Sequence, residues 1–132
     1  MKEGDRVAIW GAGPIGLFAA KWSLDIFKAS QVVIIDDVPE RLIFAENKIN
    51  QDPEKLQTVN FGQRDVLKEL KRMMPGGPDV VIDAAGFRYA KTMFQKIERA
   101  LYLSTDQCDV LTEAITAVRK VGFSPKSIRF IL

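Results

Sequence analysis

A glycine-rich turn near the start of the chain constrains the fold more than any other feature of the sequence. Residues 11–16 read Gly-Ala-Gly-Pro-Ile-Gly; they follow the apolar run 7–10 and precede a helix-like stretch that begins at Leu17. A second apolar run, 32–35, ends in Asp36, 20 residues after the last glycine of the turn. The order of strand, glycine turn, helix, strand and acid predicts a βαβ unit whose turn accepts a dinucleotide.

Each residue type in this unit has a physical reason to be there. Gly11 permits the sharp turn, Gly13 leaves room for a pyrophosphate to approach the backbone, and Gly16 allows the helix to pack closely on the sheet. Pro14 suits a helix start, where free N–H groups and the helix dipole favour an anion. The carboxylate of Asp36 is placed to accept hydrogen bonds from both ribose hydroxyls. Because it would repel a 2′-phosphate, the sequence favours NAD over NADP.

The composition argues against several other function classes. The chain has 132 residues and a net charge of +2, and no dense Lys/Arg cluster points to nucleic acid. No apolar run reaches the ~18–20 residues of a membrane span, and no leader-like segment indicates export. The single cysteine, Cys108, fits a reducing cytoplasm. Since the chain has no histidine, neither a His/Cys zinc site nor a Ser-His-Asp triad can be assembled from it alone. We therefore expect no catalytic and no metal-ligating residues in it.

Strand-like and helix-like segments alternate along the chain, which predicts an α/β fold with a parallel sheet covered by helices on both faces. Strands are expected at Arg6–Trp10, Gln31–Asp36, Thr58–Phe61, Asp79–Asp83 and Ser127–Leu132. Helices are expected at Pro14–Phe27, Glu40–Lys48, Arg64–Met74 and Asp106–Lys120. No repeat or linker interrupts this pattern, so residues 1–132 are expected to form a single NAD(P)-binding Rossmann domain, a doubly wound parallel sheet of about five strands.

Four segments together resemble the medium-chain dehydrogenases/reductases, and most closely the zinc-dependent alcohol dehydrogenases. The segments are residues 4–17, 35–42, 77–86 and 113–120. Within that family the Val-Pro-Glu-Arg-Leu stretch, residues 38–42, resembles the branch that includes glutathione-independent formaldehyde dehydrogenase. Family enzymes carry zinc in a separate catalytic domain, which is expected to be absent from this chain, as is the sixth strand of the full fold. The resemblance thus implies that the chain supplies cofactor binding but not catalysis.

The resemblance also implies a set of cofactor-binding residues. They are Gly11, Ala12, Gly13, Pro14, Ile15, Gly16, Asp36, Asp37, Arg41, Asp83, Ala84 and Ala85. The glycine loop and Asp36 match the family pattern directly. For Asp83 the alternative is that the acid caps neighbouring backbone at the end of its strand, and for Arg41 the alternative is an exposed position without a cofactor contact.

Three other functions remain as alternatives at the level of sequence. An S-adenosylmethionine-binding methyltransferase-like module also uses a glycine turn, but its usual GxGxG spacing is broken by Ile15. A short-chain dehydrogenase would need Lys at position 93 after Tyr89, where the chain has Met93. A truncated, non-enzymatic Rossmann remnant would act by association, because an exposed edge strand over Ile128–Leu132 could form a homo-oligomer.

Overall fold

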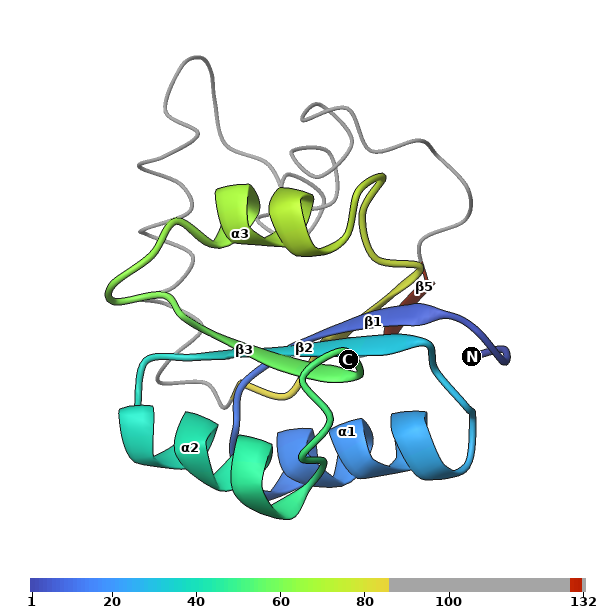
Figure 1. Ribbon diagram of the computed structural model, residues 1–132, viewed down its shortest axis with the longest axis horizontal. Coiled ribbons are helices and arrows are strands. Elements are labelled where there is room, and N and C mark those ends of the chain that lie inside the picture. The colour runs from blue at the N-terminus through green and yellow to red at the C-terminus, as the bar shows by residue number, and fades with distance from the viewer. Residues whose placement is uncertain (86–128, 132) are drawn as a thin grey trace.

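The structure, a computed structural model, describes residues 1–85 and 129–131 (Figure 1). In chain order the elements are β1 (Arg6–Trp10), α1 (Pro14–Asp25), β2 (Gln31–Asp36), α2 (Pro39–Lys48), β3 (Leu56–Asn60), α3 (Val66–Met73), β4 (Val80–Asp83) and β5 (Arg129–Ile131). The helix expected over residues 106–120 lies outside the described residues. None of the described helices is both long and apolar enough to cross a membrane.

The strands form one parallel sheet in the order β3-β2-β1-β4-β5. In the middle of the sheet, Ile9 of β1 lies beside Ile34 of β2 on one side and Ile82 of β4 on the other. Figure 1 shows α1 and α2 on one face of the sheet and α3 on the opposite face. The expected α/β fold is therefore confirmed. The strand order reverses between β1 and β4, and in such sheets ligands bind at the carboxyl ends of the strands beside this point.

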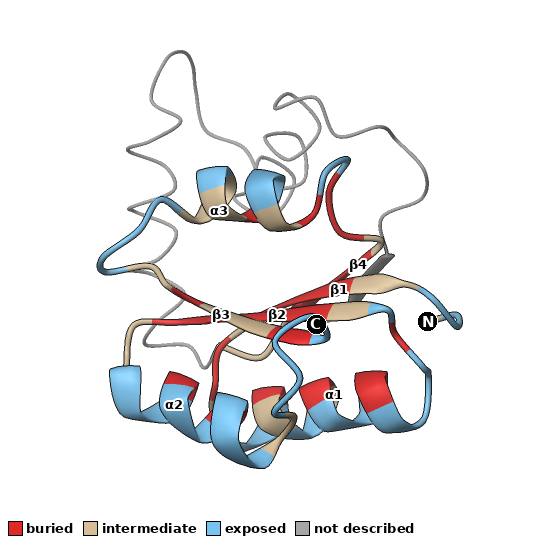
Figure 2. Cartoon of the chain, viewed as in Figure 1, coloured by how far each residue is buried: buried red, intermediate tan, exposed pale blue. Residues whose placement is uncertain are grey.

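Alternate residues of the strands supply two separate cores. Val7 and Ile9 belong to the core beneath α1 and α2, whereas Ala8 belongs to the core beneath α3, where Leu70 and Met74 are buried. The central strands are buried on both faces (Figure 2), which explains why they read as continuous apolar runs rather than alternating ones.

Several element boundaries differ from the expectation by a few residues. Helix α1 ends at Asp25 rather than Phe27, because the N–H groups of Ile26 and Phe27 both donate to the carbonyl of Trp22 and Lys28 takes a left-handed φ of 54°. Strand β3 begins at Leu56 rather than Thr58 and ends at Asn60, following its pairing with β2.

Helix α3 begins later than expected. It starts at Val66 rather than Arg64, because the side chain of Asp65 caps it by accepting hydrogen bonds from the N–H groups of Leu67 and Lys68. Gly76 and Gly77, both with positive φ, carry the chain from α3 towards β4.

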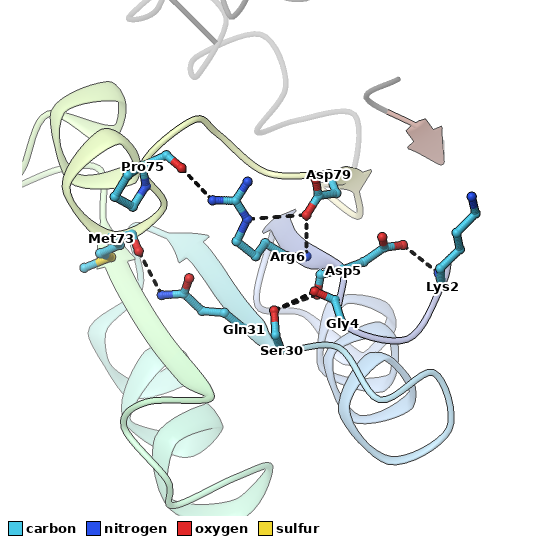
Figure 3. A network of polar contacts seen from close by, with 9 residues as sticks. All are labelled: Lys2, Gly4, Asp5, Arg6, Ser30, Gln31, Met73, Pro75 and Asp79. Atoms are coloured by element: carbon cyan, nitrogen blue, oxygen red, sulfur yellow. Dashed lines mark hydrogen bonds and ion pairs between the residues drawn. The ribbon is translucent and has the colours of Figure 1, made fainter. Parts of the chain in front are cut away.

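The amino ends of the central strands are tied by a polar network (Figure 3). The backbone N–H and the Nε of Arg6 lie 2.9 Å and 3.3 Å from Oδ2 of Asp79, and its Nη1 donates to the carbonyl of Pro75 at 2.6 Å. Gln31 on β2 donates to the carbonyl of Met73 at 3.2 Å. The network thus joins β1 and β2 to the segment between α3 and β4, at the end of the sheet opposite to the glycine loop.

We expect Arg6→Met to lower the free energy of unfolding by about 1 kcal/mol, because it removes one part-buried and one exposed polar contact but keeps the aliphatic stem. Urea unfolding followed by circular dichroism measures the change. The matched control is Lys21→Met, which breaks an exposed ion pair with Asp25 and is expected to have a smaller effect. Equal effects of the two substitutions would contradict a role for the Arg6 network in stability.

Candidate functional site

A cavity of about 240 Å³ lies at the carboxyl ends of the strands, where the strand order reverses. It is lined by Gly11, Gly13, Pro14, Ile15, Ile35, Asp36, Arg41, Phe61, Ala84 and Ala85. These residues come from the loop between β1 and α1, the end of β2, the start of α2, and the segments that follow β3 and β4. The cavity is therefore built by separate segments that the parallel sheet brings to one edge.

Two of the three glycines in the loop are required by the packing of the protein itself. Gly11 has a φ of +100°, and a Cβ there would lie 2.8 Å from the carbonyl carbon of Ala84. A Cβ on Gly16 would overlap the carbonyl oxygen of Gly11. Any side chain at either position would push the glycine loop away from β4 or from α1.

Gly13 differs from the other two glycines. Its φ is −74°, which any residue can adopt, and no atom of the described residues lies within 4 Å of the position that a Cβ would take. It nevertheless lines the cavity. Because no residue in 1–85 or 129–131 fills this space, a glycine here leaves the backbone open to a ligand.

The helix that follows the loop presents an electropositive end to the cavity. Gly13 is its N-cap residue, no side chain among the described residues caps it, and its first turn contains no acid. The first N–H groups of a helix have no partners within the helix, and the helix dipole places a partial positive charge there. The start of α1, with Pro14 and Ile15 in the cavity wall, is therefore suited to an anion such as a phosphate group.

Asp36, at the end of β2, is held rigidly beside the loop. The residue is only 6% exposed. Its Oδ2 accepts the N–H of Ala12 at 2.7 Å, and its Oδ1 accepts the N–H of Val38 at 2.9 Å. Nη1 of Arg41 lies 3.9 Å from Oδ2. Since each carboxylate oxygen can accept two hydrogen bonds, Asp36 can accept further donors from a ligand in the cavity.

The other residues predicted to bind the cofactor differ in whether they line the cavity. Ala84 and Ala85 line the cavity, whereas Ala12, Gly16, Asp37 and Asp83 are not among the residues that line it. Oδ1 of Asp83 accepts the N–H of Ala85 at 3.0 Å, which is the capping role given above as the alternative. Within the described residues, Oδ1 of Asp37 is buried without a hydrogen-bond partner.

Two residues of the lining were not predicted from the sequence. Ile35 is the penultimate residue of β2, and Phe61 directly follows β3. The rule that ligands bind at the carboxyl ends of parallel strands would have indicated both. In residues 1–85 and 129–131, the structure contains no group of three His, Cys, Asp or Glu side chains that could hold a metal ion.

Sequence comparison connects this site to known proteins, although no protein-family model matches the chain. A zinc-type alcohol dehydrogenase-like protein of Schizosaccharomyces pombe is 43% identical over 122 residues, which is 92% of this chain and 28% of that protein. The zinc-type alcohol dehydrogenase-like protein AdhB of Bacillus subtilis is 35% identical over 123 residues, 92% of this chain and 31% of that protein. The chain is homologous to one segment of the zinc-type alcohol dehydrogenase-like proteins, of the medium-chain dehydrogenase/reductase superfamily.

The chain spans less than a third of the length of these curated relatives. Its fold agrees with the assignment: the alcohol dehydrogenase TADH from Thermus sp. ATN1 superposes with a TM-score of 0.62 at 22% identity, covering 100% of this chain and 37% of that one. The cavity described above thus lies in a segment that is part of a longer oxidoreductase-like polypeptide in the relatives.

Proposed function

We propose that the chain binds NAD(H) as the cofactor-binding part of a zinc-type alcohol dehydrogenase-like oxidoreductase. The observation that carries the proposal is the difference between the three loop glycines. Gly11 and Gly16 are fixed by contacts within the protein, but Gly13 faces open space in the cavity. Within the described residues, no contact requires a glycine at position 13, and no side chain caps the helix that starts beside it. Both features suit a ligand with a phosphate group.

The residues of the cavity suit the two groups on the adenosine side of NAD(H), which are the pyrophosphate and the adenosine ribose. The first N–H groups of α1 would hold the pyrophosphate, and Asp36 would accept hydrogen bonds from the adenosine ribose. The negative charge of Asp36 favours NAD over NADP, while Arg41, Ile35 and Phe61 complete the wall of the cavity. When bound, the nicotinamide ring supplies reversible two-electron redox chemistry; the protein supplies binding and orientation.

The chemistry of the reaction is proposed to reside elsewhere. The sequence has no histidine and one cysteine, so the zinc expected for the family would be held by a different domain. We propose that the substrate is an alcohol or aldehyde, and residues 38–42 support the branch that includes glutathione-independent formaldehyde dehydrogenase. The purified chain is expected to form no NADH from alcohols or formaldehyde.

A calorimetric titration of NADH into the purified chain tests the proposed function. We expect saturable binding of NADH and no binding of S-adenosylmethionine, which is the control for the methyltransferase-like alternative. Binding of S-adenosylmethionine alone would replace the proposal with that alternative. A chain that binds neither ligand would contradict the proposal and would favour a remnant that has lost the cofactor.

ADP-ribose is expected to bind within about tenfold of NAD, a difference of ~1.4 kcal/mol. The reason is that the groups suited to the pyrophosphate and the ribose are both in the described cavity, whereas much of the nicotinamide side is expected to be held by parts of the relatives that lie outside the segment matched by this chain. Parallel titrations of the two ligands measure the difference. A much larger loss for ADP-ribose would show that this chain also holds the nicotinamide half.

A further inference from the structure

Asp37 has a carboxylate oxygen for which the described residues provide no partner. Its Oδ1 is buried, yet it accepts no hydrogen bond from residues 1–85 or 129–131. No lysine or arginine of these residues forms an ion pair with it either. A buried polar atom without a partner is rare in a native protein and needs an explanation. Since Asp37 does not line the cavity, direct contact with a ligand does not explain it.

The residue nevertheless lies between two residues that do line the cavity. Asp36 precedes it at the end of β2, and the segment after β3 that carries Phe61 packs against it. The side chain of Asn60 donates to the carbonyl oxygen of Asp37 at 3.3 Å. The Cβ of Asp37 lies 4.0 Å from the position that a Cβ on Gly62 would take. These contacts hold Asp37 beside the carboxylate that faces the proposed ribose site.

The two neighbouring acids differ in how far their negative charges are compensated. Both oxygens of Asp36 accept backbone N–H groups, at 2.7 Å and 2.9 Å, and the guanidinium of Arg41 lies 3.9 Å away. These donors offset part of its charge. Asp37 has no such donor at Oδ1 among the described residues. The amino end of α2, which begins at Pro39, favours a nearby negative charge, but only through a partial charge. Asp37 is therefore the less compensated of the two.

We propose that Asp37 is a second determinant of the choice between NAD(H) and NADP(H), and that it acts through its charge rather than through contact. The inference rests on the proposed function. A 2′-phosphate bound beside Asp36 would bring its negative charge towards a neighbouring carboxylate that has fewer donors. The intervening protein has a lower effective dielectric constant than water, which strengthens the repulsion. Asp36 thus both accepts hydrogen bonds and repels the phosphate, whereas Asp37 only repels it.

Calorimetric titrations of NADH and NADPH into the wild type and into Asp37→Asn test the proposal. The substitution removes the charge but keeps the size of the side chain. We expect the affinity for NADPH to rise about threefold, the order of magnitude for removing one charge several Å from the phosphate. The affinity for NADH should stay within about twofold of the wild type, because no contact with the cofactor is lost. Unchanged affinity for NADPH, while NADH still binds, would overturn this inference alone. A wild-type chain that binds neither cofactor would overturn the proposed function as well.

Glu40→Gln is the matched control. It removes the same charge from the first turn of α2, where Glu40 is exposed to solvent. Its ratio of the affinities for NADH and NADPH should equal that of the wild type, because water and salt screen an exposed charge. A gain in NADPH affinity as large as that of Asp37→Asn would show that net charge, rather than the position of Asp37, sets the preference.

A double variant separates direct repulsion from an effect that passes through Asp36. If Asp37 repels the phosphate itself, adding Asp37→Asn to Asp36→Asn should again raise the affinity for NADPH about threefold, because charge effects on one phosphate add when neither group positions the other. No further gain in the double variant would show that Asp37 only orients Asp36, and would contradict the proposed role.

Urea unfolding tests the premise that Oδ1 has no partner, and this measurement needs no cofactor. Asp37→Asn leaves no N–H of the described residues without its acceptor, so its midpoint should fall no further than that of Glu40→Gln, which also loses a charge at the start of α2. A clearly lower midpoint would show that a buried water or another group pairs with the carboxylate. The charge would then be compensated, and the proposal would fail.

Discussion

Gly16→Ala should lower the free energy of unfolding by about 3 kcal/mol or more, the upper range for forcing extra atoms into a packed region. The added Cβ would overlap the carbonyl oxygen of Gly11 and would lie 3.5 Å from the Cβ of Ala84. The carbonyl is backbone and cannot rotate away, so α1 would have to move off the sheet. Urea unfolding followed by circular dichroism measures the loss.

Gly13→Ala is the matched control for that substitution. The same methyl group, three residues earlier, meets no atom within 4 Å in the part of the chain that the structure describes, and a φ of −74° suits alanine. We expect the stability to stay within about 1 kcal/mol of the wild type, while the affinity for NADH falls at least about tenfold because the methyl group occupies the proposed pyrophosphate site. Equal stability losses for the two variants would contradict the distinction between a structural and a ligand-facing glycine.

The second large effect concerns the choice between NADH and NADPH. The wild-type chain should bind NADH at least about tenfold more tightly than NADPH, and Asp36→Asn should remove most of that preference. Asp36 is buried at the cavity wall, where its charge is poorly screened and repels a 2′-phosphate. The variant keeps the size of the side chain, but its amide nitrogen cannot accept a hydrogen bond, so one N–H of Ala12 or Val38 loses its partner. We expect a stability loss of about 1–3 kcal/mol alongside the change in selectivity.

Arg41 provides a further test of this interpretation. Without the carboxylate 3.9 Å away, its guanidinium becomes free to pair with a 2′-phosphate. The affinity for NADPH gained in Asp36→Asn should therefore be lost in the double variant Asp36→Asn/Arg41→Ala. Asp83→Asn is the control, since Asp83 caps a turn and does not line the cavity; its selectivity should equal that of the wild type. Unchanged selectivity in Asp36→Asn would refute the role assigned to Asp36.

The parallel sheet and the position of the glycine loop at its edge could be predicted from the sequence because both depend on local signals. The apolar runs 7–10 and 32–35 are buried on both faces, which only a central parallel strand requires. The glycines at positions 11–16 then mark the turn that joins the first strand to the first helix. The position of Asp36 beside Ala12 follows from this βαβ geometry.

The parts that the sequence did not predict depend on contacts between distant segments. The cavity includes Phe61 because β3 pairs in parallel with β2, which no local pattern specifies. Similarly, apolar residues in a helical sequence predict burial, yet Trp22 on α1 is 56% exposed.

The central claim is that a phosphate-bearing cofactor binds at the start of α1, and an NMR titration of the ¹⁵N-labelled chain with NADH tests it most directly. We expect the largest amide shifts at Gly13, Ile15 and Gly16, smaller ones near Asp36, and no response from Arg6 and Asp79 at the opposite end of the sheet. Shifts confined to other parts of the chain, or no shifts at saturating NADH, would contradict it.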